Sequence, residues 1–189
     1  MRKIIILYYS SNGKTAELAK HVRSGILDEG NNEPLLRTVV PLSKNQLDQG
    51  VPIISKTELE ECSGLALGSP TRFGTMAAAL KAFLETTSDL WLSGALIDKP
   101  AAVFTSTSSL HGGQESTLLS MALPLLHHGM TLIGVPYSCP ELFQSSGGGS
   151  PYGGGHVSGS QGENPVSKEE IEIAKSLGFR LSSHVTKIG

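Results

Sequence analysis

The chain is built from two kinds of segment that alternate along its length. Short continuous apolar runs, typical of strands covered on both faces, occur at residues 3–9, 36–40, 64–68, 100–105 and 130–135. Between them, apolar residues recur every three or four positions, as in helices with one buried face. Helices are therefore expected at about residues 15–29, 75–86, 114–128 and 167–185. Strands that alternate with helices imply an α/β fold, here a doubly wound five-stranded parallel sheet with helices on both faces.

Local signals place several boundaries of these elements. Gly30 follows the first helix, and Ser167 with Glu170 forms a capping box that begins the last one. Pro124 is expected to kink the helix in which it lies. Residues 41–62 are expected to form a loop with a short helix at its end. Residues 136–165 are rich in Gly, Ser and Pro, so we interpret residues 1–189 as one domain with a glycine-rich insertion.

Composition and charge exclude several classes of function. Lys and Arg total 15 against 17 Asp and Glu, a formal charge of -2, which argues against nucleic-acid binding. No apolar run reaches the roughly 18 residues of a membrane span, so no membrane insertion is expected. Cys62 and Cys139 are far apart and suggest reduced thiols rather than a metal site. The apolar run at the N-terminus indicates a buried strand rather than a signal peptide. Together, these features predict a cytoplasmic protein without a metal.

The turn after the first strand has the chemistry of a phosphate site. In doubly wound sheets, ligands bind where strands end and helices begin, and the free N–H groups and dipole of a helix N-terminus favour an anion. Gly13 lets the backbone curl around a phosphate, and the turn's polar side chains supply donors. The predicted site consists of Ser10, Ser11, Asn12, Gly13, Lys14 and Thr15.

Three alternatives compete with this interpretation. Gly13-Lys14-Thr15 resembles the end of a P-loop, but Tyr8 stands where that motif requires glycine, which argues against a triphosphate site. A dinucleotide fingerprint would need three glycines in this turn, and only Gly13 is present. An ordinary N-capped helix stays open, because Ser and Asn are common caps.

Two further donor-rich loops follow the third and fourth predicted strands. Ser69–Gly74 and Ser106–Gln114 would lie at the same edge of the sheet as the first turn. A flat aromatic ring system needs flexible polar loops of this kind on either side of it. Together the three loops indicate a ligand with both a phosphate and a ring.

The sequence resembles a known family, the WrbA-type NAD(P)H:quinone oxidoreductases of flavodoxin-like fold. The resemblance covers almost the whole chain in order, and its most specific segments are the Pro-Thr-Arg-Phe-Gly and His-His-Gly-Met runs. It is carried by Tyr8-Tyr9-Ser10, Gly68–Gly74, Leu90–Gly94, Gly112–Glu115, His127–Met130 and Pro151–Gly153.

The resemblance implies FMN as cofactor, NADH or NADPH as hydride donor, a quinone as substrate and a homotetramer. By position, Ser10 through Thr15 would hold the FMN phosphate. It implies that Trp91 forms an apolar wall for the substrate, that Asn12 contacts the nicotinamide and that His127 lies beside the flavin as the catalytic residue. The flavin ring would be lined by Thr71, Arg72, Phe73, Gly74, Ser106, Thr107, Ser108, Ser109, Leu110 and His111.

Several of these residues have a structural explanation as well. Trp91 could fill the core beneath a loop, and His127 could interact with the C-terminal end of its helix. Arg72 could fix its own loop rather than balance charge near a flavin. Ser108 occupies a position where the family often has glycine, so it fits only if that position does not need a positive φ. We expect Tyr152 and His156 of the insertion to order against a neighbouring subunit.

The predicted function is two-electron reduction of quinones to quinols by an FMN-dependent NAD(P)H dehydrogenase working by a ping-pong mechanism. Two alternatives stay open at this point. One is a one-electron carrier of the flavodoxin type, and the other is a regulatory flavin-binding protein that interacts with a partner. Rapid oxidation of NADH on addition of benzoquinone would favour the enzyme.

Overall fold

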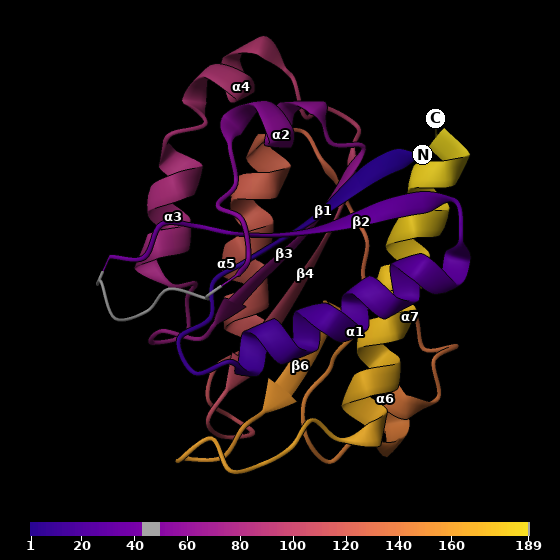
Figure 1. The fold of residues 1–189 in the computed structure, drawn as a ribbon. Helices are drawn as coiled ribbons and strands as arrows, with labels where there is room; N and C mark the ends of the chain where they lie inside the picture. The colour runs from indigo at the N-terminus through magenta and orange to yellow at the C-terminus, as the bar shows by residue number, and fades with distance from the viewer. Residues whose placement is uncertain (43–49, 189) are drawn as a thin grey trace.

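A central parallel sheet organises the structure, a computed structural model that describes residues 1–42 and 50–188 (Figure 1). Its strands follow the order β2-β1-β3-β4-β5, and β6 pairs with β4 as well. The strands are β1 (Arg2–Tyr8), β2 (Asn32–Thr38), β3 (Gly64–Pro70), β4 (Pro100–Thr107), β5 (Thr131–Leu132) and β6 (Gly154–Val157).

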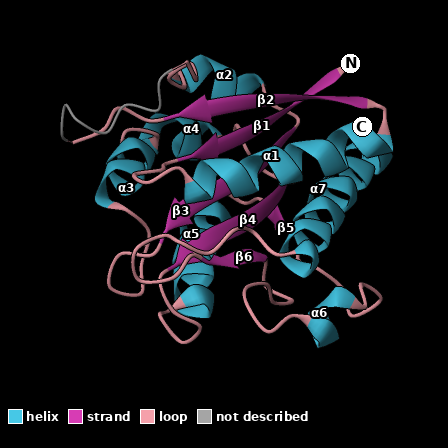
Figure 2. Ribbon diagram, turned by 60° about the horizontal axis from the view of Figure 1, so that its bottom comes forward, coloured by secondary structure: helices cyan, strands magenta, loops and turns pink. Residues whose placement is uncertain are grey.

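Helices cover both faces of this sheet (Figures 1 and 2). They are α1 (Lys14–Glu29), α2 (Lys56–Glu61), α3 (Ala78–Glu85), α4 (Ser88–Ser93), α5 (Gln114–His127), α6 (Glu141–Gln144) and α7 (Lys168–Ile188). In β1, Ile4 and Ile6 face α1 and α7, whereas Ile5 and Leu7 face the side packed by α2 to α5. This alternation explains why a fully apolar run forms the strand: each face has its own hydrophobic core.

The fifth position of the sheet is filled by two segments. β3 occupies one edge of β4 along Ala101–Ser106, so β5 and β6 both lie along the other edge. β5 pairs with the start of β4 and β6 with its end, Phe104–Thr107. The predicted strand at 130–135 is thus shortened to Thr131–Leu132, and the glycine-rich insertion supplies the other half of that position.

Other boundaries also differ from those predicted. β2 begins at Asn32, four residues before the predicted start at residue 36, and includes Pro34. A proline fits there because β2 pairs only with β1 and is an edge strand. Helix α3 begins at Ala78 rather than Thr75, because Thr75 forms a backbone bridge with Arg72. Part of the predicted 41–62 loop, residues 43–49, lies outside the described residues.

The ends of α1 and α7 agree with the sequence signals. Gly30 adopts φ 90° at the C-terminus of α1 and donates its N–H to the carbonyl of Ile26. At the start of α7, the Glu170 N–H donates to Ser167 Oγ, and the Ser167 N–H donates to the Glu170 carboxylate. Pro124 lies inside α5, which extends to His127.

Candidate functional site

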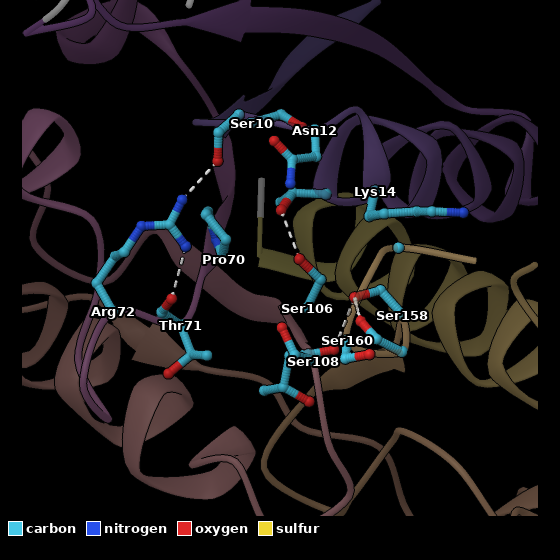
Figure 3. A pocket seen from close by; sticks show the side chains of 15 residues that line it. Ser10, Asn12, Lys14, Pro70, Thr71, Arg72, Ser106, Ser108, Ser158 and Ser160 are labelled. Atoms are coloured by element: carbon cyan, nitrogen blue, oxygen red, sulfur yellow. Dashed lines mark hydrogen bonds between the residues drawn. The ribbon is translucent and has the colours of Figure 1, made fainter. Parts of the chain in front are cut away.

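A small polar cavity of about 80 Å³ lies where β1, β3 and β4 end. The strand order reverses between β1 and β3, which is where ligands bind in doubly wound sheets. The cavity brings together residues of all three predicted loops (Figure 3). Its lining consists of Ser10, Ser11, Asn12, Lys14, Thr15, Pro70, Thr71, Arg72, Ser106, Thr107, Ser108, Ser158, Gly159, Ser160 and Gly162.

The first turn leaves the N-terminus of α1 open towards this cavity. The residue before the helix is Gly13, at φ 79°, and no side chain caps the helix there. The Ser10 hydroxyl accepts a long hydrogen bond of 3.3 Å from the Ala16 N–H, and the Thr15 and Ser106 hydroxyls lie 2.8 Å apart. The first N–H groups of a helix have no carbonyl one turn earlier to bond, so those of Lys14 and Thr15 can donate to an anion.

The two cations at this cavity behave differently. Lys14 Nζ donates to the carbonyl of Asn164 at 2.9 Å, and Figure 3 shows its side chain extending away from the serines. The exposed Arg72 donates to the carbonyl of Thr71 at 2.8 Å and to Ser11 Oγ at 2.5 Å. Arg72 therefore fixes its own loop and joins it to the first turn, with its charge at the mouth of the cavity.

The second loop exposes an aromatic side chain in a strained conformation. Phe73 has φ 53°, unusual for a bulky residue, and its side chain is fully exposed. Such a conformation costs on the order of 1–3 kcal/mol and clusters at ligand sites. Thr71 holds the loop, because its Oγ1 accepts from Thr117 Oγ1 at 2.8 Å and from the Gly74 N–H at 3.3 Å.

The third loop follows β4 and is exposed at residues 108–111. Within the described chain, only Phe73 and Asp98 combine a side chain with a positive φ, so the serine at Ser108 meets no backbone conflict. Thr107 Oγ1 donates to the carbonyl of Ser109 at 2.9 Å, which fixes the start of the loop. Leu110 is about half exposed.

A larger, mostly apolar hollow adjoins the polar cavity. Its volume is about 720 Å³, and Arg72 lines both spaces. Tyr9, Leu42, Phe73 and Met76 supply apolar surface there. The site therefore offers a polar end that suits an anion beside an apolar space that suits a ring.

Trp91 and His127 do not line this site. They line a separate hollow of about 560 Å³, with Trp91 on α4 rather than in the expected loop. The 14 residues of α5 make it about 20 Å long, and His127 is at the end far from Gly113. Figure 1 shows α4 at the opposite end of α5 from β6. One copy of the chain does not bring His127 or Trp91 to the phosphate cavity.

The neighbouring His128 has a structural role. It ends α5 and is buried, with Nε2 3.0 Å from Thr87 Oγ1. Burial lowers the pKa of His128, and the adjacent His127 lowers it further. Its position at the end of α5 and its contact with Thr87 therefore explain His128, whereas His127 is exposed and free to contact another molecule.

Sequence reasoning missed the residues that the insertion adds to the cavity. Ser158, Gly159, Ser160 and Gly162 come from the turn after β6, within the segment expected to be irregular. Their composition could have identified them, because this turn combines serine hydroxyls with glycine as the other three loops do. His156 is also placed differently from the expectation: it is wholly buried within its own chain, so it is not a subunit contact. Tyr152 is half exposed.

Comparisons with known proteins agree with this geometry. The family model described as NADPH-dependent FMN reductase matches residues 3–139. A protein of Chromohalobacter salexigens named NAD(P)H dehydrogenase (quinone) is 37% identical over 100% of this chain and 99% of its own length. No helix of the described chain is long and apolar enough to span a membrane.

Solved structures confirm the flavodoxin-like fold. A flavodoxin, WrbA-like protein from Agrobacterium tumefaciens has a TM-score of 0.73 at 21% identity, with both chains fully covered. An archaeal flavodoxin has a TM-score of 0.67 at 19% identity, covering 97% of this chain and 99% of its own.

Proposed function

The chain belongs to the NADPH-dependent FMN reductase family, and from this premise we propose that it is an FMN-dependent NAD(P)H:quinone oxidoreductase. The observation that carries the proposal is the polar cavity at the ends of β1, β3 and β4, beside the N-terminus of α1. The relative named NAD(P)H dehydrogenase (quinone), which aligns over the whole chain, supports the choice of reaction.

The donor set fits a phosphate monoester. The hydroxyls of Ser10, Thr15 and Ser106 belong to buried residues, so their side chains lose little conformational freedom when a ligand binds. Together with the free N–H groups of α1, they can surround a phosphate with neutral donors, and Arg72 adds one positive charge. We assign the phosphate of FMN to this cavity and the ring to the loops Thr71–Gly74 and Ser106–His111.

FMN, when bound, supplies hydride chemistry between a nicotinamide and a quinone. The chain's own residues would bind and orient it: the N-terminus of α1 would hold the phosphate end, and the strained loop at Phe73 and the half-exposed Leu110 would contact the ring. In a ping-pong cycle, nicotinamide and quinone use the same space in turn, and Asn12 stays our candidate for a nicotinamide contact.

A second copy of the chain is needed if Trp91 and His127 take part. Within one chain, His127 lies at the end of α5, about 20 Å along the helix from the loop that follows β4. The exposed apolar side chains around these residues suit an interface between copies: Trp91, Leu92, Leu119, Leu123 and Leu126 are each about half exposed or more. We therefore propose a homotetramer in which a partner subunit presents His127 and Trp91 to the quinone. His127 would donate a hydrogen bond to the developing quinol oxygen.

The direct test uses purified protein loaded with FMN. We expect rapid oxidation of NADH or NADPH on addition of benzoquinone, and little oxidation when FMN is removed. Absorbance at 340 nm follows the reaction. Bound FMN without oxidation of either donor would contradict the enzyme and favour a carrier or a regulatory protein.

The role of a second copy is tested by complementation between two variants. His127→Asn is expected to lower quinone turnover at least tenfold with FMN still bound, as removal of a general acid does. Ser106→Asp is expected to abolish FMN binding, because its carboxylate would repel the phosphate. Co-expressed in one cell, the two variants should give hybrid oligomers with more activity than the sum of the separate variants.

The control is His184→Asn on α7, which should retain the activity of the unmodified chain. Activity of the hybrids no greater than the sum would contradict a site shared between copies. Full turnover by His127→Asn would exclude this residue from catalysis.

A further inference from the structure

The glycine-rich insertion returns to the ligand edge of the sheet through β6. This strand runs parallel to β4, with Phe104 opposite Gly154 and Thr107 opposite Val157. Parallel strands end at the same edge, so the turn that follows β6 emerges beside the turns that follow β1 and β4. The Ser158 N–H continues the ladder by donating to the carbonyl of Thr107 at 2.8 Å.

The segment after β6, residues 158–164, is a closed turn held by its own hydrogen bonds. The Asn164 N–H donates to the carbonyl of Ser158 at 2.9 Å, and the Gln161 N–H donates to the Glu163 carboxylate at 2.8 Å. Gly159 and Gly162 adopt positive φ values of 81° and 73°, which lets the chain reverse. The turn is therefore shaped before any ligand binds.

Contacts at both ends position this turn against the phosphate cavity. At its C-terminal end, the carbonyl of Asn164 accepts from Lys14 Nζ in the first turn of α1. At its N-terminal end, Glu170 accepts from the Val157 N–H at 2.9 Å and from His156 Nδ1 at 2.8 Å. The Glu170 carboxylate also accepts from the Gly148 N–H, so it joins β6 to the segment that precedes it in the insertion.

Two serines of this turn line the cavity from the side facing Asn12 (Figure 3). The Ser158 hydroxyl donates to the carbonyl of Thr107 at 3.0 Å, so it is engaged in holding the turn. Ser160 is exposed, and within the described chain its hydroxyl makes no hydrogen bond. It is a donor at the cavity wall that the fold itself does not use.

We propose that the turn Ser158–Gly162 is the fourth wall of the FMN phosphate site and that Ser160 donates a hydrogen bond to the phosphate. This inference rests on the proposed function, since it takes FMN as the ligand. It makes the insertion a determinant of phosphate recognition, so that FMN is preferred over riboflavin partly through Ser160. The acidic Glu163 is kept from the cavity lining by its hydrogen bond to the turn's backbone.

Flavin titrations of the full-length protein, freed of FMN, test this inference. Quenching of flavin fluorescence gives Kd for FMN and for riboflavin separately. Ser160→Ala is expected to raise the Kd for FMN about tenfold, as loss of a hydrogen bond to a charged group does, and to leave that for riboflavin within about twofold. Ser160→Asp is expected to raise the Kd for FMN about a hundredfold or more through charge repulsion.

The matched control is Ser146→Ala, an exposed serine of the same insertion that does not line the cavity. It should bind both flavins as the unmodified chain does. Equal affinity for FMN in all three variants would overturn the inference while leaving the proposed function intact. An equal loss of FMN and riboflavin in Ser160→Ala would also overturn it, because it would indicate a contact with the ring or a folding defect. Failure of the unmodified chain to bind FMN would instead contradict the proposed function.

Discussion

Replacing Gly178 with alanine is expected to lower the free energy of unfolding by about 3 kcal/mol. Gly178 lies where α7 crosses α1, and a Cβ at this position would stand 2.0 Å from the carbonyl oxygen of Val22. The contact is reciprocal, because a Cβ at Gly25 would stand 1.9 Å from the carbonyl oxygen of Lys175. Both obstacles are backbone atoms, so the two helices would have to move apart over the whole interface.

Two effects of opposite sign compete in this variant. Alanine is a better helix former than glycine by about 1 kcal/mol, which would stabilise α7. Overpacking of a close helix contact typically costs 1–3 kcal/mol and occasionally more, and here a whole carbon must be accommodated against a carbonyl. We therefore expect the steric term to dominate and the melting temperature to fall by about 6–12 °C.

Urea unfolding followed by circular dichroism measures the loss. Ser183→Ala, a substitution on the same helix at a partly exposed position, is the control and should change the stability by less than about 0.5 kcal/mol. A Gly178→Ala variant as stable as the unmodified chain would show that α1 and α7 can separate freely, contrary to the close packing of the structure.

The elements with the strongest patterns were the ones that could be predicted. β1, β3 and β4 are buried on both faces, so their uninterrupted apolar runs identify them to within two residues at each end. The edge strand β2 has one neighbour and carries polar residues and Pro34, so its start was misplaced. The pattern of apolar residues reflects how much of a strand is buried. An edge strand is less buried, so its ends are harder to locate from that pattern.

The insertion could not be predicted from its local pattern. β6 has the sequence Gly-Gly-His-Val, which has little strand propensity, and it forms because β4 leaves an edge open beyond the short β5. His156 is buried there because Glu170, 14 residues later, accepts its hydrogen bond. Such a strand depends on a long-range contact, which neither composition nor periodicity reports.

The part of the candidate site that could be predicted is the part that the parallel arrangement of the strands determines. Three loops after parallel strands must meet at one edge, and the cavity confirms that the loops beginning at Ser10, Pro70 and Ser106 do so. The loop after β6 cannot be predicted in the same way, because the sequence does not identify β6 as a strand. The relation of His127 to this edge depends on the length of α5 and on how copies assemble, which residue types alone do not reveal.

Loss of the Glu170 carboxylate is the second large effect that we expect. The residue is 2% exposed, and its side chain accepts four hydrogen bonds, from His156 Nδ1 and from the N–H groups of Gly148, Val157 and Ser167. Glu170→Ala would leave these donors without their acceptor. Because buried donors without partners are costly, we expect it to lower the free energy of unfolding by about 3–5 kcal/mol and to loosen the insertion.

A matched control separates this effect from loss of charge at the start of α7. Glu169→Ala removes the same charge one residue earlier, at a partly exposed position in the same helical turn. It should cost no more than about 0.5–1 kcal/mol, the usual contribution of a carboxylate near a helix N-terminus. Similar stabilities for the two variants, measured by urea unfolding at pH 7, would show that the buried hydrogen bonds of Glu170 contribute little.

The contribution of Glu170 should also depend on pH, with a sign that the structure determines. Burial by itself raises the pKa of Glu170, but the hydrogen bonds from His156 and from the N–H groups of Ser167, Val157 and Gly148 outweigh it and hold the pKa below the ordinary value of 4.5. A lowered pKa in the folded state means that the stabilisation is complete above pH 4.5 and is lost as the pH falls through the folded-state pKa. The stability difference between the unmodified chain and Glu170→Ala should therefore be constant from pH 7 to about pH 5 and narrow in more acidic solution. A difference that widens on acidification would mean that the folded state favours the protonated carboxyl, which the four donors around it oppose.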